Sequence, residues 1–178
     1  DGTNNTISNF EESVEISSNG TLSQGQGTTA NFVDGVLSSH SVTFSTTGTF
    51  VLLATETGGA TSGESNNFTV NSGPADPGNS QITAAPTSIQ NDGSSTSTIT
   101  VTLRDPNNNK LDSGGDSVTL STTAGSLSPV SDNNDGTYTA TLTSSTNETT
   151  ATITGKVNSQ TISDDASVIF ADIFIWQS

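Results

Sequence analysis

Alternation of apolar and polar residues with a period of two is the feature that most limits what this chain can fold into. Ile99, Val101 and Leu103 alternate with threonines, and similar alternation recurs in residues 138–142 and 151–157. Successive side chains of a strand point to opposite faces, so such runs gather their apolar residues on one face of a sheet. No stretch combines a 3.6-residue apolar period with helix-capping signals. The pattern therefore predicts an all-β chain of short antiparallel strands.

Turn signals divide the second half of the chain into seven or eight such strands. Asn91-Asp-Gly93 and residues 132–136 contain the residues that favour turns and positive φ. Pro86 is expected to break a first, irregular edge strand at residues 82–89. The expected strands of this chain are spaced by 8 to 15 residues. A spacing of about 8–12 residues is typical of an antiparallel β-sandwich.

The two halves of the chain are weakly similar copies of one unit. Residues 1–23 match residues 105–128, with Val14 and Ile16 at the places of Val118 and Leu120. Gly48-Thr-Phe50 also matches Gly136-Thr-Tyr138. Repetition of this kind indicates two related modules in series.

The repeat sets the domain boundaries that we predict. They are a sandwich at 1–72, a linker at 73–79 with two prolines, a second sandwich at 80–171, and an apolar tail or start of a next segment at 172–178. Nothing corresponds to the strands at 82–89 and 98–103, so the first sandwich should lack its two opening strands. Those strands lie upstream in a longer repeat protein, or another segment or subunit supplies them by strand addition.

The tail contains four successive apolar residues, Ile173, Phe174, Ile175 and Trp176. A solvent-exposed stretch of this kind favours association. It either enters a following domain or forms a strand that pairs with a neighbouring copy.

Composition excludes several classes of function. The formal net charge is −15, and the only cations are Arg104, Lys110 and Lys156. Nucleic-acid binding needs a basic surface, and anionic membranes repel an acidic one. There is no cysteine, so thiolate metal sites and a disulfide between sheets are excluded. No run approaches the ~20 apolar residues of a membrane span.

Three sequence blocks resemble a known family. Residues 95–105, 117–127 and 135–142 occur in order and are similar to bacterial immunoglobulin-like domains of the invasin/intimin type over about residues 80–171. Residues 48–56 and 67–70 resemble related Ig-like repeats of large secreted bacterial proteins. The resemblance implies tandem Ig-like β-sandwiches on the bacterial cell surface or secreted, and it carries no catalytic residues.

Two acidic segments are candidates for calcium. Asp105, Asn107 and Asn109 have the 1, 3, 5 spacing of a calcium loop, although Lys110 stands where the loop needs glycine. Asp76 and Asn79 could hold a cation that stiffens the linker. In each case ordinary turn formation is the competing interpretation, and we expect no other cofactor.

The remaining chemical groups favour structural roles. The chain contains no Gly-x-Ser-x-Gly motif that would present a nucleophilic serine to His40. We therefore expect His40 at the surface. Glu11-Glu12 and Asp164-Asp165 are adjacent, so they cannot form a facing acid–base pair within a strand. Lys156 should point outward, whereas Tyr138 should pack in the core with its hydroxyl bonded to nearby backbone.

We expect no enzymatic activity. The sequence favours a structural stalk or spacer in a bacterial extracellular adhesin or filament. Its partners would be neighbouring Ig-like domains of the same chain or copies of itself, with any ligand bound at a distant tip. The alternatives are a filament subunit that exchanges strands between copies, and an accessory module of a secreted polysaccharide-degrading enzyme.

Overall fold

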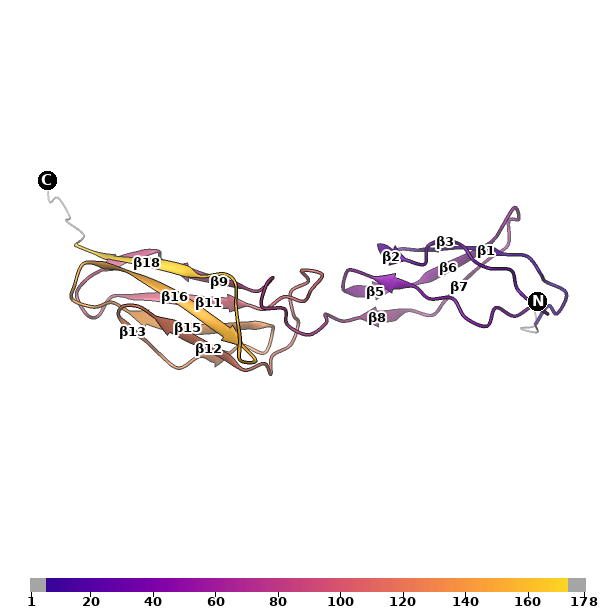
Figure 1. The fold of residues 1–178 in the computed structure, drawn as a ribbon. Helices are drawn as coiled ribbons and strands as arrows, with labels where there is room; N and C mark the ends of the chain where they lie inside the picture. The colour runs from indigo at the N-terminus through magenta and orange to yellow at the C-terminus, as the bar shows by residue number, and fades with distance from the viewer. Residues whose placement is uncertain (1–5, 173–178) are drawn as a thin grey trace, which may run out of the picture. The chain divides into compact units, whose positions relative to one another are not determined.

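The computed structural model describes residues 6–172, and these residues contain strands and no helix (Figure 1). The chain divides into two compact units, Asp1–Asn71 and Ser72–Ser178, called the first and second unit below. The all-β prediction is therefore confirmed.

The second unit is built from ten strands. They are β9 (Gln81–Ala85), β10 (Ser88–Gln90), β11 (Thr96–Thr102), β12 (Val118–Thr122), β13 (Ser126–Leu127), β14 (Ser131–Asp132), β15 (Thr137–Thr143), β16 (Thr149–Val157), β17 (Gln160–Thr161) and β18 (Ala166–Ala171).

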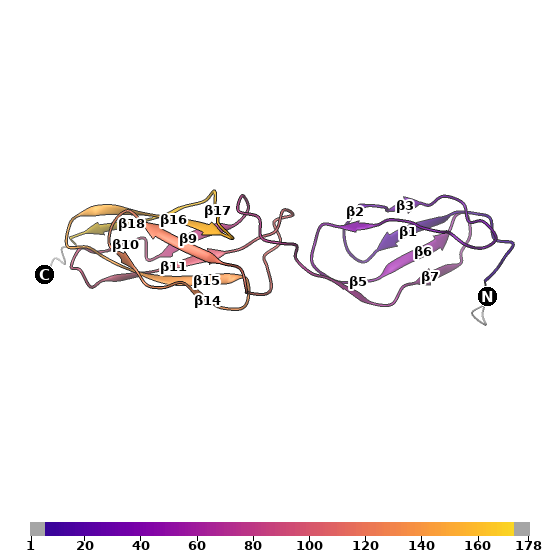
Figure 2. The same cartoon turned by 60° about the horizontal axis from the view of Figure 1, so that its bottom comes forward.

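These strands form the two sheets of a sandwich (Figures 1 and 2). One sheet has the order β13-β15-β11-β9, with β14 also paired to β15. The other has the order β10-β18-β16-β12, with β17 also paired to β16. All pairs are antiparallel except β10–β18, which is parallel.

The first strand segment changes sheets at the predicted proline. β9 ends at Ala85 and pairs with β11, whereas β10 begins at Ser88 and pairs with β18 in the opposite sheet. Proline has no N–H to give to a ladder, so Pro86 suits the crossing between the two sheets.

The core of the second unit lies between its two sheets. Ile99, Val101 and Leu103 are completely buried, as is Phe170 on the opposite sheet. The threonines that alternate with them face outward or lie at partly covered positions. The period-two pattern of the sequence therefore located this core correctly.

The first unit is built from eight shorter strands. They are β1 (Val14–Ser18), β2 (Leu22–Gln24), β3 (Gly27–Thr28), β4 (Thr43–Phe44), β5 (Gly48–Phe50), β6 (Leu52–Glu56), β7 (Ser62–Glu64) and β8 (Phe68–Val70). One sheet has the order β3-β1-β6-β7, and the other two pairs are β2–β4 and β5–β8.

The pairings show which strands of the two units correspond. β1 pairs with β6 as β12 pairs with β16, and β2 pairs with β4 as β13 pairs with β15. Gly48-Thr-Phe50 forms β5, which directly precedes β6 and is therefore in the place of β16. Gly136-Thr-Tyr138 lies at the start of β15. The sequence match between the two segments therefore aligns strands that do not correspond in the structure, and this prediction is wrong.

The first unit has little buried core among its described residues. Of its apolar side chains in residues 6–71, only Leu22 is buried. The predicted inward-facing residues are half-buried: Val14, Ile16, Phe32, Val42, Phe44, Phe50, Leu52, Phe68 and Val70. Ile7 is 51% exposed, whereas Leu111, its partner in the repeat, is buried. No strands of the described residues stand in the places of β9, β10 and β11.

Candidate functional site

The connection between β11 and β12 begins with a buried carboxylate. Asp105 is 3% exposed and accepts hydrogen bonds from the backbone N–H groups of Gly73 at 3.0 Å and of Asn107 and Asn109 at 2.9 Å. The side-chain amide of Asn109 also donates to it, at 3.0 Å to Oδ2. A buried carboxylate that is bonded in this way fixes the loop and the segment that carries Gly73.

The segment predicted as a linker lies against the second unit. The Asp76 backbone N–H donates to the Arg104 carbonyl at 2.7 Å. The side-chain amide of Asn79 donates to the Asp105 carbonyl at 2.9 Å. Together with the Gly73 bond, these contacts attach residues 73–79 to the second unit before β9 begins. We call this set of contacts the Asp105 clamp.

Hydrogen bonding determines the charge state of the clamp. Burial by itself would raise the pKa of Asp105. Hydrogen bonds from the Asn109 side chain and from the Gly73, Asn109 and Asn107 backbones outweigh burial, and the pKa lies below the ordinary value. Asp105 is therefore ionised at neutral pH, and the clamp depends on its negative charge.

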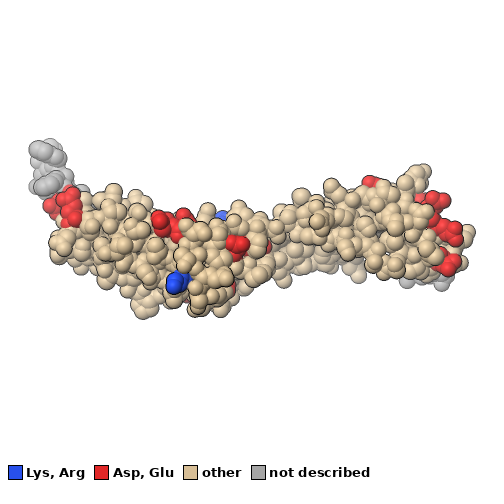
Figure 3. All heavy atoms as spheres, viewed as in Figure 1, with Lys and Arg blue, Asp and Glu red and all other residues tan. Residues whose placement is uncertain are grey.

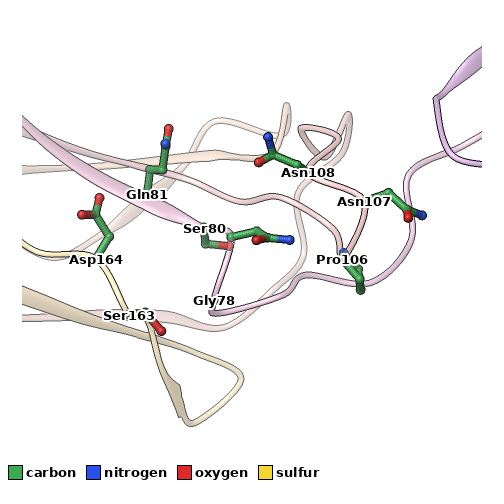
Figure 4. Close-up of a pocket in the computed structure, with 9 residues that line it drawn as sticks. Gly78, Ser80, Gln81, Pro106, Asn107, Asn108, Ser163 and Asp164 are labelled. Carbon is green, nitrogen blue, oxygen red and sulfur yellow. The ribbon is translucent and has the colours of Figure 1, made fainter.

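A polar pocket of about 640 Å³ includes Asn79 of the clamp in its lining, and Figure 4 shows the residues that line it. Its lining comes from three segments of the second unit, residues 78–81, 106–108 and 163–164. Asp164 contributes a structural bond here, since its Oδ2 accepts the Ile82 backbone N–H at 2.8 Å. The sequence analysis excluded a facing acid–base pair at Asp164 but missed this structural bond, because nothing local marks the distant donor.

The calcium candidates are close together but already bonded to N–H groups. Both carboxylate oxygens of Asp105 accept such bonds, and Oδ1 of Asp76 accepts the backbone N–H of Gly78 at 2.6 Å. Asn107 is exposed. Among residues 6–172, no group of three or more His, Asp or Glu side chains is arranged to hold a metal ion. Calcium binding here stays a prediction.

Tyr138, near the start of β15, is bonded to the acidic connection between β11 and β12. Tyr138 is 2% exposed, and its hydroxyl oxygen accepts the backbone N–H of Asp116 at 2.9 Å, as the sequence predicted. Burial raises the pKa of Tyr138, and the nearby charge of Asp132 adds to the rise. Asp132 itself accepts the Gly115 and Asn134 backbone N–H groups at 2.8 Å. These hydrogen bonds hold turns in place.

The other predicted residues lie at the surface. His40 is exposed, with Nε2 2.8 Å from the Gly25 carbonyl oxygen. Glu11 and Glu12 are exposed, and so is Lys156 on β16, whose outward direction is confirmed. The tail residues Ile173, Phe174, Ile175 and Trp176 lie outside the described residues.

An aromatic cluster marks the half-covered face of the first unit. The rings of Phe44 and Phe50 stack with centroids 4.7 Å apart, and Phe68 meets Phe44 edge-on at 5.5 Å. A second pair, Phe10 and Phe32, meets edge-on at 5.1 Å beside a hollow of about 460 Å³. All five rings are only half-buried, although they form the interior of this unit.

Charge is spread thinly over the surface. On the face drawn in Figure 3, Asp and Glu form small separate groups among uncharged residues, and basic groups are sparse. Lys110 lies 3.4 Å from the Asp135 carboxylate in an exposed ion pair. Residues 6–172 include no helix that is long and apolar enough to cross a membrane.

Comparison with known proteins identifies the second unit. Residues 76–172 match the model of the family "Invasin, domain 3", and this match covers more than half of the chain. The chain belongs to the invasin domain 3 family. The buried core of the second unit and Asp105 lie within this match, whereas Gly73 precedes it.

The solved structures that resemble this chain include bacterial adhesins. The Yersinia pseudotuberculosis adhesin InvE is 37% identical over 55% of this chain and 28% of its own, with a TM-score of 0.50. The Escherichia coli adhesin FdeC is 21% identical over 97% of this chain and 56% of its own, with a TM-score of 0.55, a likeness of fold. The integrin-binding protein invasin is 32% identical over 92% of this chain and 33% of its own, with a TM-score of 0.49. The chain thus spans about a third or less of InvE and invasin and carries Ig-like domains of an adhesin family.

Proposed function

We propose that this chain is a spacer segment of an extracellular bacterial adhesin and that its second unit carries tension along the chain. A spacer must keep its fold while its two ends are pulled apart. Membership of the invasin domain 3 family and the likeness to InvE support an adhesin. The acidic composition, with a net charge of −15, suits a surface that repels its neighbours.

The parallel pairing of β10 with β18 is the observation that carries the proposal. β10 lies near the start of the second unit and β18 lies at its end, and Ser88, Ile89 and Gln90 face Ile169, Phe170 and Ala171 in register. Tension on the two ends pulls parallel neighbours in opposite directions along their length. The hydrogen bonds of the pair are then loaded in shear and must break together, rather than one after another.

The Asp105 clamp supports the same role at the point where the chain enters the second unit. Gly73, Asp76 and Asn79 are bonded to the loop that follows β11. Load that arrives through residue 73 therefore meets hydrogen bonds to the β11–β12 connection before it reaches β9.

Single-molecule pulling on the whole chain by its two ends tests the proposal, and the first unit serves as an internal control. Fully extended, the second unit spans roughly 360 Å and the first roughly 240 Å, at ~3.4 Å per residue, so the two unfolding events are distinguishable by length. Residues 6–71 contain no parallel pair of end strands. We expect the longer event at clearly higher force. A second unit that extends gradually, or yields before the first, would contradict the proposal.

A further inference from the structure

β12 is an edge strand that lacks the usual guards against pairing with another chain. It lies at the end of its sheet, and no strand of residues 6–172 pairs with its outer edge. Its sequence, Val-Thr-Leu-Ser-Thr, contains no proline and no charged residue. Natural proteins guard exposed edges with charges, prolines, short strands or covering groups, because a free edge accepts a strand from elsewhere.

The other edge strands of the second unit are guarded. On β9, Asp164 accepts the outward N–H of Ile82 at 2.8 Å. β10 and β13 have only three and two residues. Pro86 precedes β10, and Pro129 follows β13. The described part of this unit therefore offers one edge of useful length to another chain, the five residues of β12.

The hydrogen bonds at the two ends of β12 show which of its backbone groups face outward. The Ser117 carbonyl accepts the Asn158 N–H at 2.8 Å, and the Thr123 N–H donates to the Thr152 carbonyl at 3.1 Å. Every second residue of an antiparallel strand bonds to the same neighbour, so positions 119 and 121 also bond to β16. The N–H and C=O groups of the three intervening residues point to the free edge: Val118, Leu120 and Thr122.

The residues of β12 suit pairing with a second copy of the same strand. Val118 and Leu120 pack half-buried against the core, whereas Thr119 and Ser121 are exposed on the outer face. Two identical edges related by a two-fold axis pair as antiparallel strands, because only that direction brings their outward backbone groups opposite one another. With the axis at Leu120, this residue meets its own copy, and Val118 meets Thr122 of the second copy. The three facing pairs exchange up to about six hydrogen bonds.

The acidic charge of the chain does not oppose this arrangement. The charged residues nearest to β12 in sequence are Asp116 before it and Asp132 after it. In the antiparallel register Asp116 faces Ala124 of the second copy, eight positions from the second copy's own Asp116. Eight residues of strand span roughly 27 Å, which is well beyond the Debye length of about 8 Å at physiological salt. Two copies of an acidic protein can therefore meet at β12 with little repulsion.

We propose that β12 is a self-association edge, which pairs antiparallel with β12 of a second copy and joins one sheet of each second unit into a single sheet. On the outer face Thr119 lies opposite Ser121 of the second copy, and in the interior the two Leu120 side chains cover each other. The contact is a closed two-fold dimer, since each copy uses its one free edge of useful length. This inference does not depend on the load-bearing role proposed for the second unit.

Sedimentation analysis of the whole chain tests the proposal. A joint between two single strands buries less than the roughly 1,200 Å² of a standard stable interface, so we expect a weak, reversible dimer. Protein concentrations up to about 1 mM reach the range in which such dimers form. The mass should rise with concentration from monomer toward dimer and no further.

Paired charges at the joint separate this dimer from other kinds of association. Thr119→Asp with Ser121→Asp places carboxylates opposite one another on the exposed face and should raise the dissociation constant at least about tenfold. Thr119→Lys with Ser121→Lys should do the same, and an equimolar mixture of the two double variants should associate again. Ser167→Asp with Ile169→Asp is the matched control. It adds the same charge at alternate exposed positions of β18, which β16 separates from β12, and should leave association unchanged.

Disulfide formation tests the register. The chain has no natural cysteine, so single cysteines report one contact each. Residue 119 of one copy and residue 121 of the other form a facing pair with Cα atoms about 4.5 Å apart, within reach of a disulfide. Two copies of residue 119 are offset by two positions and lie about 7–8 Å apart, too far for an unstrained bond. A mixture of Thr119→Cys and Ser121→Cys should therefore crosslink faster than either variant with itself.

Three results would overturn the proposal. The first is a monomer at every concentration, which would leave the edge of β12 to a strand of another protein. The second is a dimer that the charges on β18 disrupt and the charges on β12 do not. The third is cysteines that crosslink to their own copies as readily as to each other.

Discussion

The backbone N–H of Gly73 lies 3.0 Å from Oδ2 of Asp105, a residue 32 positions further along the chain. This bond joins the segment that enters the second unit to the loop that follows β11. It makes a stretch that the sequence predicts as a short linker with two prolines part of the second unit, and the first two predictions below concern this bond.

Asp105→Asn should destabilise the second unit by about 2 kcal/mol, the usual cost of removing a buried charged acceptor. The side-chain NH₂ group of the new asparagine would face backbone N–H groups that now donate to a carboxylate oxygen of Asp105. Urea unfolding measures the loss, and hydrogen exchange at Gly73 should accelerate. Asp112→Asn removes the same charge from an exposed position of the same loop and should change stability by less than about 0.5 kcal/mol. Equal effects of the two variants would contradict the clamp.

Acid should weaken the second unit through the same residue. The pKa of Asp105 is lowered in the folded state, so its contribution is complete above the unfolded value of about 3.9. It is lost as pH falls from there through the folded pKa. Hydrogen bonds from the Ser95 and Ser94 backbones lower the pKa of Asp92 as well, in the same direction. Thermal melts from pH 7 to pH 2 should show wild type falling toward Asp105→Asn, with the two curves converging in acid.

Tyr138→Phe should lower the free energy of unfolding by about 1 kcal/mol, because the partly buried N–H of Asp116 loses its acceptor while the ring still fills the core. In wild type the phenol should titrate above pH 10, since burial raises its pKa. Denaturant unfolding and the ultraviolet absorbance of the phenolate measure the two effects. If the Tyr138 phenol titrated like a free tyrosine and Tyr138→Phe were as stable as wild type, the hydrogen bond between Tyr138 and Asp116 would be contradicted.

Gly136 should tolerate no side chain. Its φ is +77°, and an added Cβ would lie 2.1 Å from the Leu111 carbonyl oxygen. Gly136→Ala combines backbone strain with a clash against backbone, and we expect a loss of at least about 2 kcal/mol. Gly115→Ala is the matched control, since its φ is also positive but nothing lies near the added Cβ. Gly115→Ala should lower the free energy of unfolding by only about 1 kcal/mol.

The sequence predicted those parts of the fold that depend on local pattern. Alternation identified Ile99, Val101 and Leu103 as core, and Pro86 marked the break between β9 and β10, although not the change of sheets there. The offset between Gly48-Thr-Phe50 and Gly136-Thr-Tyr138 misled, because Gly-Thr-aromatic suits the start of any strand here. Only pairing distinguishes β5 from β15.

The candidate site was less predictable, because an aspartate in an Asp/Asn-rich loop looks the same whether it binds calcium or backbone N–H groups. The 1, 3, 5 spacing of Asp105, Asn107 and Asn109 also produces a turn in which the first carboxylate accepts the two later N–H groups. The decisive donor, Gly73, lies far away in sequence. No local rule would have associated it with Asp105.

The most direct test of the account compares Ile169→Pro with Leu142→Ala in single-molecule pulling. The Ile169 N–H donates to the Thr87 carbonyl at 2.9 Å, so proline weakens the β10–β18 pair, whereas Leu142 is fully buried in β15 of the other sheet. Temperature is adjusted so that the two variants have equal free energy of unfolding. The load-bearing role predicts a markedly lower unfolding force for Ile169→Pro. Equal forces at equal stability would contradict it.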